Sequence, residues 1–310
     1  KALEIMPNSR ISQHPNVAFD LSVMDIFSGL YAGAQIFPIH SSVDKLFPGR
    51  SISRNRLSHW ISVPSVIDLM ARDKQLGLDN FKTLNKVVFC GEPLLSRHLR
   101  FIFEHNPTVS VLNTYGPTEA TVCVTNLELR KDNWQTKVRG SAPLGDAIPG
   151  MKIELEGGRE ANQGQIVLSG RQIAEGYWKS PDLTKKSFKN GRYYTGDWGE
   201  IIHGELYFKS RIDRQIKIHG HRIELGDIED TISKFISGAV ACVAVDNVIV
   251  LFMEENSYEI NVVKSFIDEK LPEYMRPGKI FTLLRLPRSL NDKVDYKVLT
   301  KTAKGELRNE

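Results

Sequence analysis

Residues 113–121 read Asn113-Thr114-Tyr115-Gly116-Pro117-Thr118-Glu119-Ala120-Thr121, at the end of an apolar, β-branched run over residues 109–113. The Gly116-Pro117 pair predicts a sharp turn after a strand. Such a turn exposes backbone N–H groups, and Thr118 and Thr121 add hydroxyls that can hold phosphate oxygens. Tyr115 offers a flat face to a base, and Glu119 offers a hard oxygen ligand to Mg²⁺. Taken alone, the segment is equally typical of a structural turn with a threonine N-cap.

The sequence before this turn alternates between strand-like and helix-like segments. Residues 60–63 and 87–90 are short apolar runs, and each is followed by a helix-like segment, over residues 65–71 and 94–104. Residues 19–39 likewise read as a helix followed by a short strand. Because strands that are separated by helices pair in parallel, this region predicts an α/β domain with a parallel sheet.

The sequence after residue 152 has a different pattern. Alternation over residues 153–156, a strand-like run over 164–168 and a hairpin over 200–208 predict a small antiparallel β section. From residue 213, helix-like segments alternate with strand-like ones up to residue 284, and the remaining tail is polar. We therefore predict two domains. Residues 1–212 form a parallel α/β sheet with a small β section, and residues 213–310 form a small α+β domain.

Composition excludes several classes of protein. The chain has 310 residues and a formal net charge of +4, an excess too small and too dispersed to indicate nucleic-acid binding. No apolar run approaches the ~20 residues of a membrane span. Cys90, Cys123 and Cys242 form no CxxC pair, which favours a reducing compartment, the cytoplasm, over a disulfide framework. The chain opens at Lys1, with no initiator Met and no apolar core of a signal peptide, so we expect this start to be a cut end.

Three further segments carry candidate chemistry. Residues 193–197 end in Gly196-Asp197, and a carboxylate after such a turn can accept two hydrogen bonds from a ribose diol. Residues 210–224 read as a strand and a tight turn with many charges, which are also typical of a solvated strand face. Residues 291–297 form a turn that carries Lys293, which by itself is typical of a solvated lysine. Each segment alone is better explained by ordinary structure than by function.

In this order along the chain, the four segments resemble the adenylate-forming superfamily, specifically its amino-acid-activating adenylation domains. The resemblance covers essentially the whole chain, with further matching blocks at residues 19–22, 89–94, 164–167, 176–177, 181–184 and 271–277. Within the superfamily, residues 19–25, 89–92, 113–121 and 217–220 resemble the D-alanine–D-alanyl carrier protein ligases. Peptide synthetase domains usually have Arg at the position of His219. Adenylation domains of nonribosomal peptide synthetases are the alternative.

The resemblance implies a fold and a two-step reaction. Residues 1–212 would be the C-terminal part of the family's large domain, and residues 213–310 its mobile C-terminal domain. A carboxylate attacks the α-phosphate of ATP, with Mg²⁺, and gives an acyl-adenylate and pyrophosphate. The acyl group then moves to the phosphopantetheine thiol of a carrier protein. The implied partners are therefore a small amino acid and that carrier protein.

The resemblance also implies an amino-acid site. Asp20 would pair with the substrate ammonium, because a buried unpaired ammonium is costly. Met24 and Cys90 would leave room for a small side chain such as that of alanine, and the preference for the D-isomer rests on the resemblance alone. The implied pocket wall consists of Leu21, Met24, Ser62, Val88, Cys90, Thr114, Val122 and Cys123.

The implied nucleotide site has Tyr115 against the adenine and Asp197 on the ribose. Glu119 would bind Mg²⁺, Thr118 the α-phosphate, and Arg211 the ribose or phosphates. Lys293 would offset charge that grows on phosphorus. Elsewhere, Asp213 would be the hinge between the two states and Gly220 would line the thiol tunnel. The remaining implied nucleotide-site residues are Gly91, Glu92, Asn113, Gly116 and Lys217.

The sequence departs from the family at several positions. Asp292 stands where the family usually has Gly, Tyr296 where it has Arg, and Ser210 where it has Gly. The family's phosphate loop, which ends in Pro-Lys-Gly, precedes the Phe-Asp-x-Ser motif, and nothing in residues 1–18 resembles it. We therefore expect a missing N-terminal segment. A truncated module that binds without catalysis is an alternative, as is an acyl- or aryl-CoA synthetase, against which Asp20 argues.

Overall fold

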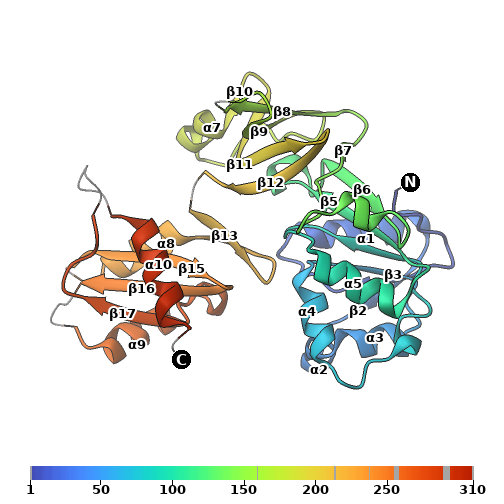
Figure 1. Cartoon of the computed structure of the whole chain (residues 1–310), viewed down its shortest axis with the longest axis horizontal. Helices are drawn as coiled ribbons and strands as arrows, with labels where there is room; N and C mark the ends of the chain where they lie inside the picture. The colour runs from blue at the N-terminus through green and yellow to red at the C-terminus, as the bar shows by residue number, and fades with distance from the viewer. Residues whose placement is uncertain are drawn as a thin grey trace. The chain divides into compact units, whose positions relative to one another are not determined.

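The computed structural model describes residues 2–158, 160–212, 214–236, 238–254, 258–288 and 294–308. The chain divides into two compact units, Lys1–Ile212 and Asp213–Glu310 (Figure 1). Asp213 and Lys293, to which the sequence assigned a hinge and a catalytic role, lie outside the described residues.

The first unit is built on a seven-stranded sheet with the order β2-β1-β3-β4-β5-β6-β7. Strands β1 to β5 run parallel, whereas β6 and β7 are antiparallel to their neighbours. The strand order reverses at β1 and β3, as in doubly wound folds, where ligands bind at the carboxyl ends of the strands. The strands are β1 Arg10–Gln13, β2 Gln35–Pro38, β3 His59–Ser62, β4 Lys86–Phe89, β5 Ser110–Tyr115, β6 Thr125–Leu129 and β7 Asp146–Ala147.

Apolar side chains on both faces of this sheet form two cores, because successive strand residues point in opposite directions. Trp60 and Phe89 belong to the larger core, whereas Ile61 and Val88 belong to a smaller core with Leu21 of α1. The helices that connect the strands are α1 Leu21–Ala32, α2 Ser42–Leu46, α3 Pro48–Arg54, α4 Ser65–Arg72, α5 Ser96–His105 and α6 Trp134–Lys137, with 3-10 turns η1 Leu78–Asn80 and η2 Thr118–Ala120.

A five-stranded antiparallel sheet completes the first unit. Its order is β10-β11-β9-β8, and β12 pairs with β11. The β11–β12 hairpin closes at His203 and Gly204, both with positive φ, 52° and 83°, as a two-residue hairpin turn requires. The elements are β8 Met151–Gly157, β9 Gln163–Gly170, α7 Pro181–Ser187, β10 Phe188–Lys189, β11 Arg192–Ile202 and β12 Glu205–Arg211.

The second unit is a small α+β domain. Helices α8 and α9 pack on one face of its three-stranded sheet, and α10 packs on the other face. A separate hairpin, β13–β14, precedes α8. The elements are β13 Gln215–Ile218, β14 His221–Glu224, α8 Leu225–Ser233, β15 Val240–Val245, β16 Val248–Glu254, α9 Ile260–Lys270, η3 Glu273–Met275, β17 Lys279–Leu283 and α10 Tyr296–Glu306.

The predicted fold class, a parallel α/β sheet with a small β section followed by an α+β module, is confirmed. The interpretation of the tail as merely polar was incomplete, because α10 buries Leu299 and Ala303 against the sheet of the second unit. None of the described helices combines the length and the apolar character that crossing a bilayer demands.

Candidate active site

Asp20 lies in the connection between β1 and α1, at the point where the strand order of the sheet reverses. It is the N-cap residue of α1, yet its carboxylate makes no capping hydrogen bond within this fully described helix. The side chain is half-buried. The carboxylate therefore lies at the edge of the sheet where doubly wound folds bind ligands, and it does not cap its own helix.

An apolar cluster lies beside Asp20 on the same face of the sheet. Val88 lies on β4, and Cys90 directly follows the last residue of that strand. The Cys90 thiol contacts the Val122 carbonyl oxygen at 3.5 Å. Thr114 at the end of β5 is buried and donates a hydrogen bond of 2.8 Å to the Phe89 carbonyl. The members of the cluster that were assigned to the pocket wall are Leu21, Met24, Val88, Cys90 and Val122.

Cys123 connects this cluster with Asp20. Burial raises the pKa of its thiol to about 12, and the nearby Cys90 thiol and Asp20 carboxylate add to this effect. The thiol therefore stays protonated and neutral at physiological pH. An apolar wall with the neutral Cys123 thiol beside a carboxylate suits a small ligand that carries a positive charge.

Ser62 is the pocket-wall candidate that the structure does not bring to this cluster. Its hydroxyl accepts a hydrogen bond of 2.9 Å from the Trp60 indole and donates one of 3.1 Å to the Val63 carbonyl. Trp60 belongs to the core on the opposite face of the sheet. Since residues two apart on a strand share a face, the Ser62 side chain points away from Val88.

The loop that follows β5 is backbone-strained. Thr121 and Val122 have φ values of 56° and 68°, a region that β-branched residues rarely occupy. A Cβ at Gly116 would lie 2.6 Å from the Cys123 Cα, so only glycine permits this close approach. The Gln172 amide donates to the carbonyl oxygens of Ala120, Thr121 and Cys123 and so fastens the loop. Such strain persists only where surrounding contacts enforce it, and it often marks functional loops.

Tyr115, Asp197 and Arg211 form a second group. The Tyr115 phenol donates a hydrogen bond of 2.6 Å to Asp197, and the Arg211 guanidinium donates one of 2.7 Å to the other carboxylate oxygen. Arg211 also reaches the Thr195 carbonyl at 3.1 Å. Burial, followed by the Asp197 charge, raises the pKa of Tyr115 well above its ordinary value. The structure thus brings together Tyr115, which was assigned to the adenine, Asp197, assigned to the ribose, and Arg211, assigned to the ribose or phosphates.

Glu119 is buried beside Tyr177, whose phenol donates to it at 2.6 Å. Burial and this hydrogen bond raise the pKa of Tyr177. Sequence analysis assigned no role to Tyr177, although it stands in a block that resembles the family. No group of three or more His, Cys, Asp or Glu side chains among the described residues could hold a metal. A single carboxylate fits Mg²⁺ that arrives bound to nucleotide phosphates.

Other candidates of the first unit have structural partners. The Glu92 carboxylate accepts a hydrogen bond of 3.0 Å from the Ser65 amide, at the first turn of α4. The Asn113 amide donates to the Pro143 carbonyl at 2.9 Å. Gly91, with φ of 97°, permits the turn after β4. Thr118 is exposed at the start of η2. In the second unit, Lys217 is exposed on β13 and Gly220, with φ of 82°, follows His219 in the turn to β14.

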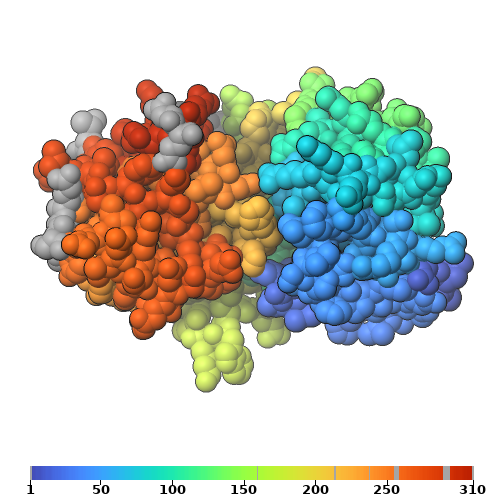
Figure 2. Space-filling view, turned by 90° about the horizontal axis from the view of Figure 1, so that it is seen from below, coloured from blue at the N-terminus to red at the C-terminus, as the bar shows by residue number. Residues whose placement is uncertain are grey.

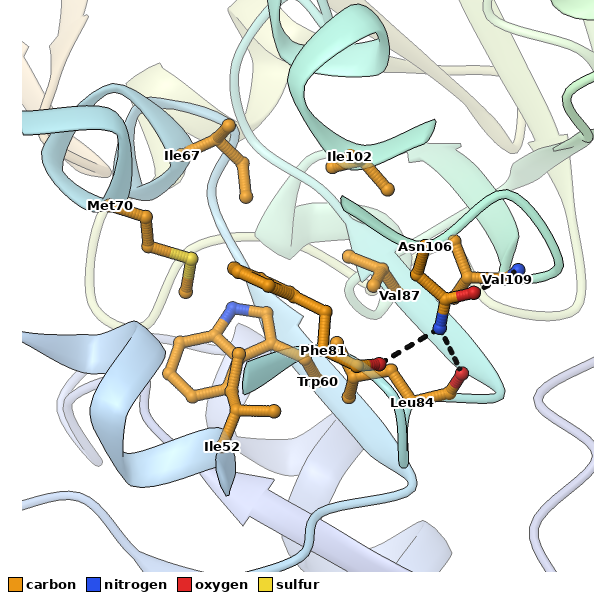
Figure 3. Close-up of a pocket in the computed structure, with 10 residues that line it drawn as sticks. All are labelled: Ile52, Trp60, Ile67, Met70, Phe81, Leu84, Val87, Ile102, Asn106 and Val109. Carbon is orange, nitrogen blue, oxygen red and sulfur yellow. Dashed lines mark hydrogen bonds between the residues drawn. The ribbon is translucent and has the colours of Figure 1, made fainter. Parts of the chain in front are cut away.

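A small cavity in the first unit is lined by residues to which the sequence assigned no role in the site (Figure 3). Its lining is apolar except for Asn106, whose amide donates to the carbonyl oxygens of Phe81 and Leu84. Trp60, Phe81 and Met70 belong to the larger core of the sheet, so this cavity is a packing feature.

Comparisons with known proteins place the chain in a family. Residues 2–178 match the family model described as AMP-binding enzyme. D-Alanine–D-alanyl carrier protein ligases of Listeria monocytogenes serotype 4a and Bacillus cytotoxicus are 32% and 31% identical, each over 91% of this chain and 60% of its own length. The Vibrio cholerae adenylation domain AlmE, solved in complex with glycyl-adenosine-5'-phosphate, has a TM-score of 0.86 and 28% identity, covering 98% of this chain and 60% of that one. The chain thus spans about 60% of the length of its curated relatives, and it belongs to the AMP-binding enzyme family.

Proposed function

We propose that this chain carries the amino-acid and nucleotide sites of an enzyme that activates a small amino acid with ATP. D-Alanine is the first candidate, and the acyl group would pass to the phosphopantetheine thiol of a carrier protein. The observation that carries the proposal is the Asp20 carboxylate beside the apolar wall of Leu21, Val88 and Cys90. A site for fatty or aryl acids has no use for a carboxylate there.

The amino-acid end of the proposed site works by charge and size. The Asp20 carboxylate would pair with the substrate ammonium, and the neutral Cys123 thiol adds no competing charge. Met24 and Cys90 would limit the side chain of the substrate to a methyl group or less. A ligand of this kind is small, cationic at the amine and anionic at the carboxylate.

The proposed nucleotide site depends on the Asp197 carboxylate, which its neighbours hold in place. Arg211 and Tyr115 hold Asp197 from two sides, which would orient it toward a ribose diol. Tyr177 fixes Glu119, which would contact Mg²⁺ on the phosphates. The strained loop over residues 116–124 joins the two ends, so substrate carboxylate and α-phosphate would meet along it.

The roles proposed for residues of the second unit rest on the resemblance of the sequence to adenylation domains. Lys293 would offset the charge that develops on phosphorus, Asp213 would act as the hinge, and Gly220 would line the path of the thiol. Lys217 would approach the nucleotide. The first unit would be the pocket domain and the second unit the mobile domain.

Glycine is a second candidate substrate. It is the aminoacyl group in the adenylate bound to the Vibrio cholerae domain, whereas the curated relatives are named for D-alanine. A hydrophobic pocket separates two substrates that differ by one methyl group by only about 10–200-fold. Relative rates, not presence or absence of activity, will therefore distinguish them.

The test is amino-acid-dependent exchange between ATP and pyrophosphate with D-alanine, L-alanine, glycine and serine. Exchange is measured with the chain alone and with the remaining part of the Listeria ligase added. We expect the fastest exchange with D-alanine, and a loss of at least a hundredfold in Asp20→Asn and Lys293→Ala. Exchange that is unchanged in Asp20→Asn, or equal for all four amino acids, would contradict the proposal.

A further inference from the structure

The loop after β5 contains a turn that its own residues disfavour. The Cys123 amide donates a hydrogen bond of 2.8 Å to the Thr121 carbonyl oxygen, which closes a three-residue turn around Val122. Val122 has a φ of 68°, and three-residue turns with a positive φ at the central residue are rare and strained. Thr121 also lies in the left-handed region, with φ of 56° and ψ of 72°. Both residues are β-branched, so they keep this conformation only where other contacts enforce it.

Gln172 supplies such contacts. Its side-chain amide nitrogen lies 3.2, 3.2 and 3.1 Å from the carbonyl oxygens of Ala120, Thr121 and Cys123. The Thr121 hydroxyl returns a hydrogen bond of 3.2 Å to the Gln172 carbonyl oxygen. One side chain therefore binds the backbone on both sides of Val122.

The segment that carries Gln172 is anchored on the five-stranded sheet. It follows β9, and Figure 2 shows this part of the chain, in yellow-green, at the surface of the first unit. The Gln172 backbone amide donates to the Met151 sulfur at 3.4 Å, and Ile173 packs against the core beneath this sheet. The Ala174 amide donates to the Glu119 carbonyl oxygen at 2.8 Å. The loop is thus held by a segment that is itself fixed to a different sheet.

The same loop also forms part of the proposed amino-acid pocket. Val122 is buried in the cluster with Leu21, Val88 and Cys90, and its carbonyl oxygen contacts the Cys90 thiol. The backbone conformation of Val122 decides where its side chain lies, so a relaxed φ would move this wall of the pocket. The size of the pocket therefore depends on the hydrogen bonds of Gln172.

We propose that Gln172 is a positioning residue that sets the substrate specificity of the pocket. By holding Thr121 and Val122 in the left-handed region, it keeps the Val122 wall where a small amino acid fits and a larger one does not. The specificity role rests on the proposed function, whereas the restraint of the loop does not. Gln172→Met tests both, because Met is unbranched like Gln and packs similarly but has no N–H group to donate.

The first measurement is the rate at which a maleimide labels Cys123, which lies in the loop itself. Burial raises the pKa of this thiol to about 12, so the closed loop reacts slowly. We expect labelling to be about tenfold faster in Gln172→Met, because an open loop exposes the thiol and lowers its pKa. Cys123→Ser identifies the signal. The matched control is Gln163→Met on β9, where the side-chain amide reaches Glu200 at 3.4 Å, and its labelling rate should be unchanged.

Urea separates opening of the loop from unfolding of the chain. Local opening exposes little surface, so the labelling rate of Gln172→Met should stay constant between zero and about 1 M urea. A rate that rises steeply with urea would show that the reagent reaches Cys123 through global unfolding, and it would overturn the proposal. Equal labelling rates in Gln172→Met and the unsubstituted chain would overturn it as well.

The second measurement is specificity, which a purely structural contact would leave unchanged. Stable sulfamoyl analogues of D-alanyl-adenylate and of the larger D-valyl-adenylate are titrated into each variant by calorimetry. One methylene in an apolar pocket changes affinity by about 10–200-fold, so we expect Gln172→Met to reduce the preference for the alanyl analogue by about tenfold. Gln163→Met should retain the preference.

The two measurements separate failure of the inference from failure of the proposed function. Faster labelling of Cys123 in Gln172→Met with an unchanged preference would overturn the specificity role. If neither analogue binds the unsubstituted chain, the proposed function fails and the specificity role fails with it. The labelling rates then still decide whether Gln172 holds the loop.

Discussion

The Tyr115 phenol donates a hydrogen bond of 2.6 Å to Asp197, a residue 82 positions further along the chain. This bond joins the end of the parallel sheet to the five-stranded sheet, since Tyr115 ends β5 and Asp197 lies on β11. Because Arg211 binds the other oxygen of Asp197, both oxygens of the carboxylate are held in place.

Tyr115→Phe should lower the free energy of unfolding of the chain by about 1.5–3 kcal/mol, because a buried hydrogen bond to a charged group is lost. Urea unfolding measures the change. The control is Tyr194→Phe, which removes a phenol that donates at 3.1 Å to the partly exposed Glu156, and it should cost well under half as much. If both variants lose the same free energy of unfolding, the Tyr115–Asp197 hydrogen bond stabilises the chain no more than an exposed one.

Tyr177→Phe should raise the Mg²⁺ concentration that half-maximal exchange requires by about tenfold, because the partner that orients Glu119 is removed. Tyr207→Phe is the matched control, since that phenol donates at 2.7 Å to the Lys137 carbonyl. If Tyr207→Phe raises the required Mg²⁺ concentration by the same factor, the effect comes from lost stability and not from the orientation of Glu119.

Asp25→Asn should make the chain more stable at neutral and higher pH. Burial raises the pKa of Asp25 from 3.8 to about 7, against the opposing effect of the Ile26 and His14 amides. The folded state therefore keeps a proton that the unfolded state loses, and stability falls as pH rises from about 4 to about 7. The full difference corresponds to at most about 4 kcal/mol.

The measurement for Asp25 is the free energy of unfolding at pH 4 and pH 8. The variant should match the unsubstituted chain at pH 4 and exceed it at pH 8. Asp79→Asn, at an exposed ion pair with Lys82, should leave the pH dependence as it is. A stability difference that is the same at both pH values would refute the assignment.

Glu229→Gln should destabilise the second unit by about 3–5 kcal/mol, because Arg214 would lose its buried partner. The Arg214 guanidinium donates to both Glu229 oxygens, one at 2.6 Å, and the Cys242 amide donates to the same carboxylate at 2.6 Å. Arg214 also lies 3.8 Å from the Tyr296 ring centroid. Asp268→Asn, which breaks the exposed pair with Arg276, should cost less than about 1 kcal/mol in thermal unfolding.

Local patterns predicted most of the fold. Apolar runs at β3, β4 and β5 and the hairpin at His203-Gly204 carry their own signals, namely β-branched residues and turn glycines. Helix α10 was missed because its buried side chains, Leu299 and Ala303, are few among Lys and Thr. Its packing depends on a sheet that lies far away in the sequence.

The candidate site was predictable only as a set of segments. Asp20 and Cys90 come after β1 and β4, and Tyr115 ends β5; parallel pairing brings these strand ends to one edge. Ser62 failed to join the pocket cluster because strand alternation, together with the Trp60 indole, turns its hydroxyl to the other face. The roles of Tyr177 and Gln172 depend on distant loops, so no local pattern could reveal them.

The most direct test of the central claim is a binding measurement that needs no turnover. A stable sulfamoyl analogue of D-alanyl-adenylate and its counterpart without the amino group, a propionyl analogue, are titrated into the chain by calorimetry. We predict that the amino compound binds at least tenfold more tightly, and that Asp20→Asn removes this preference while the affinity for the propionyl analogue is retained. Equal affinity of the unsubstituted chain for the two analogues would contradict the account.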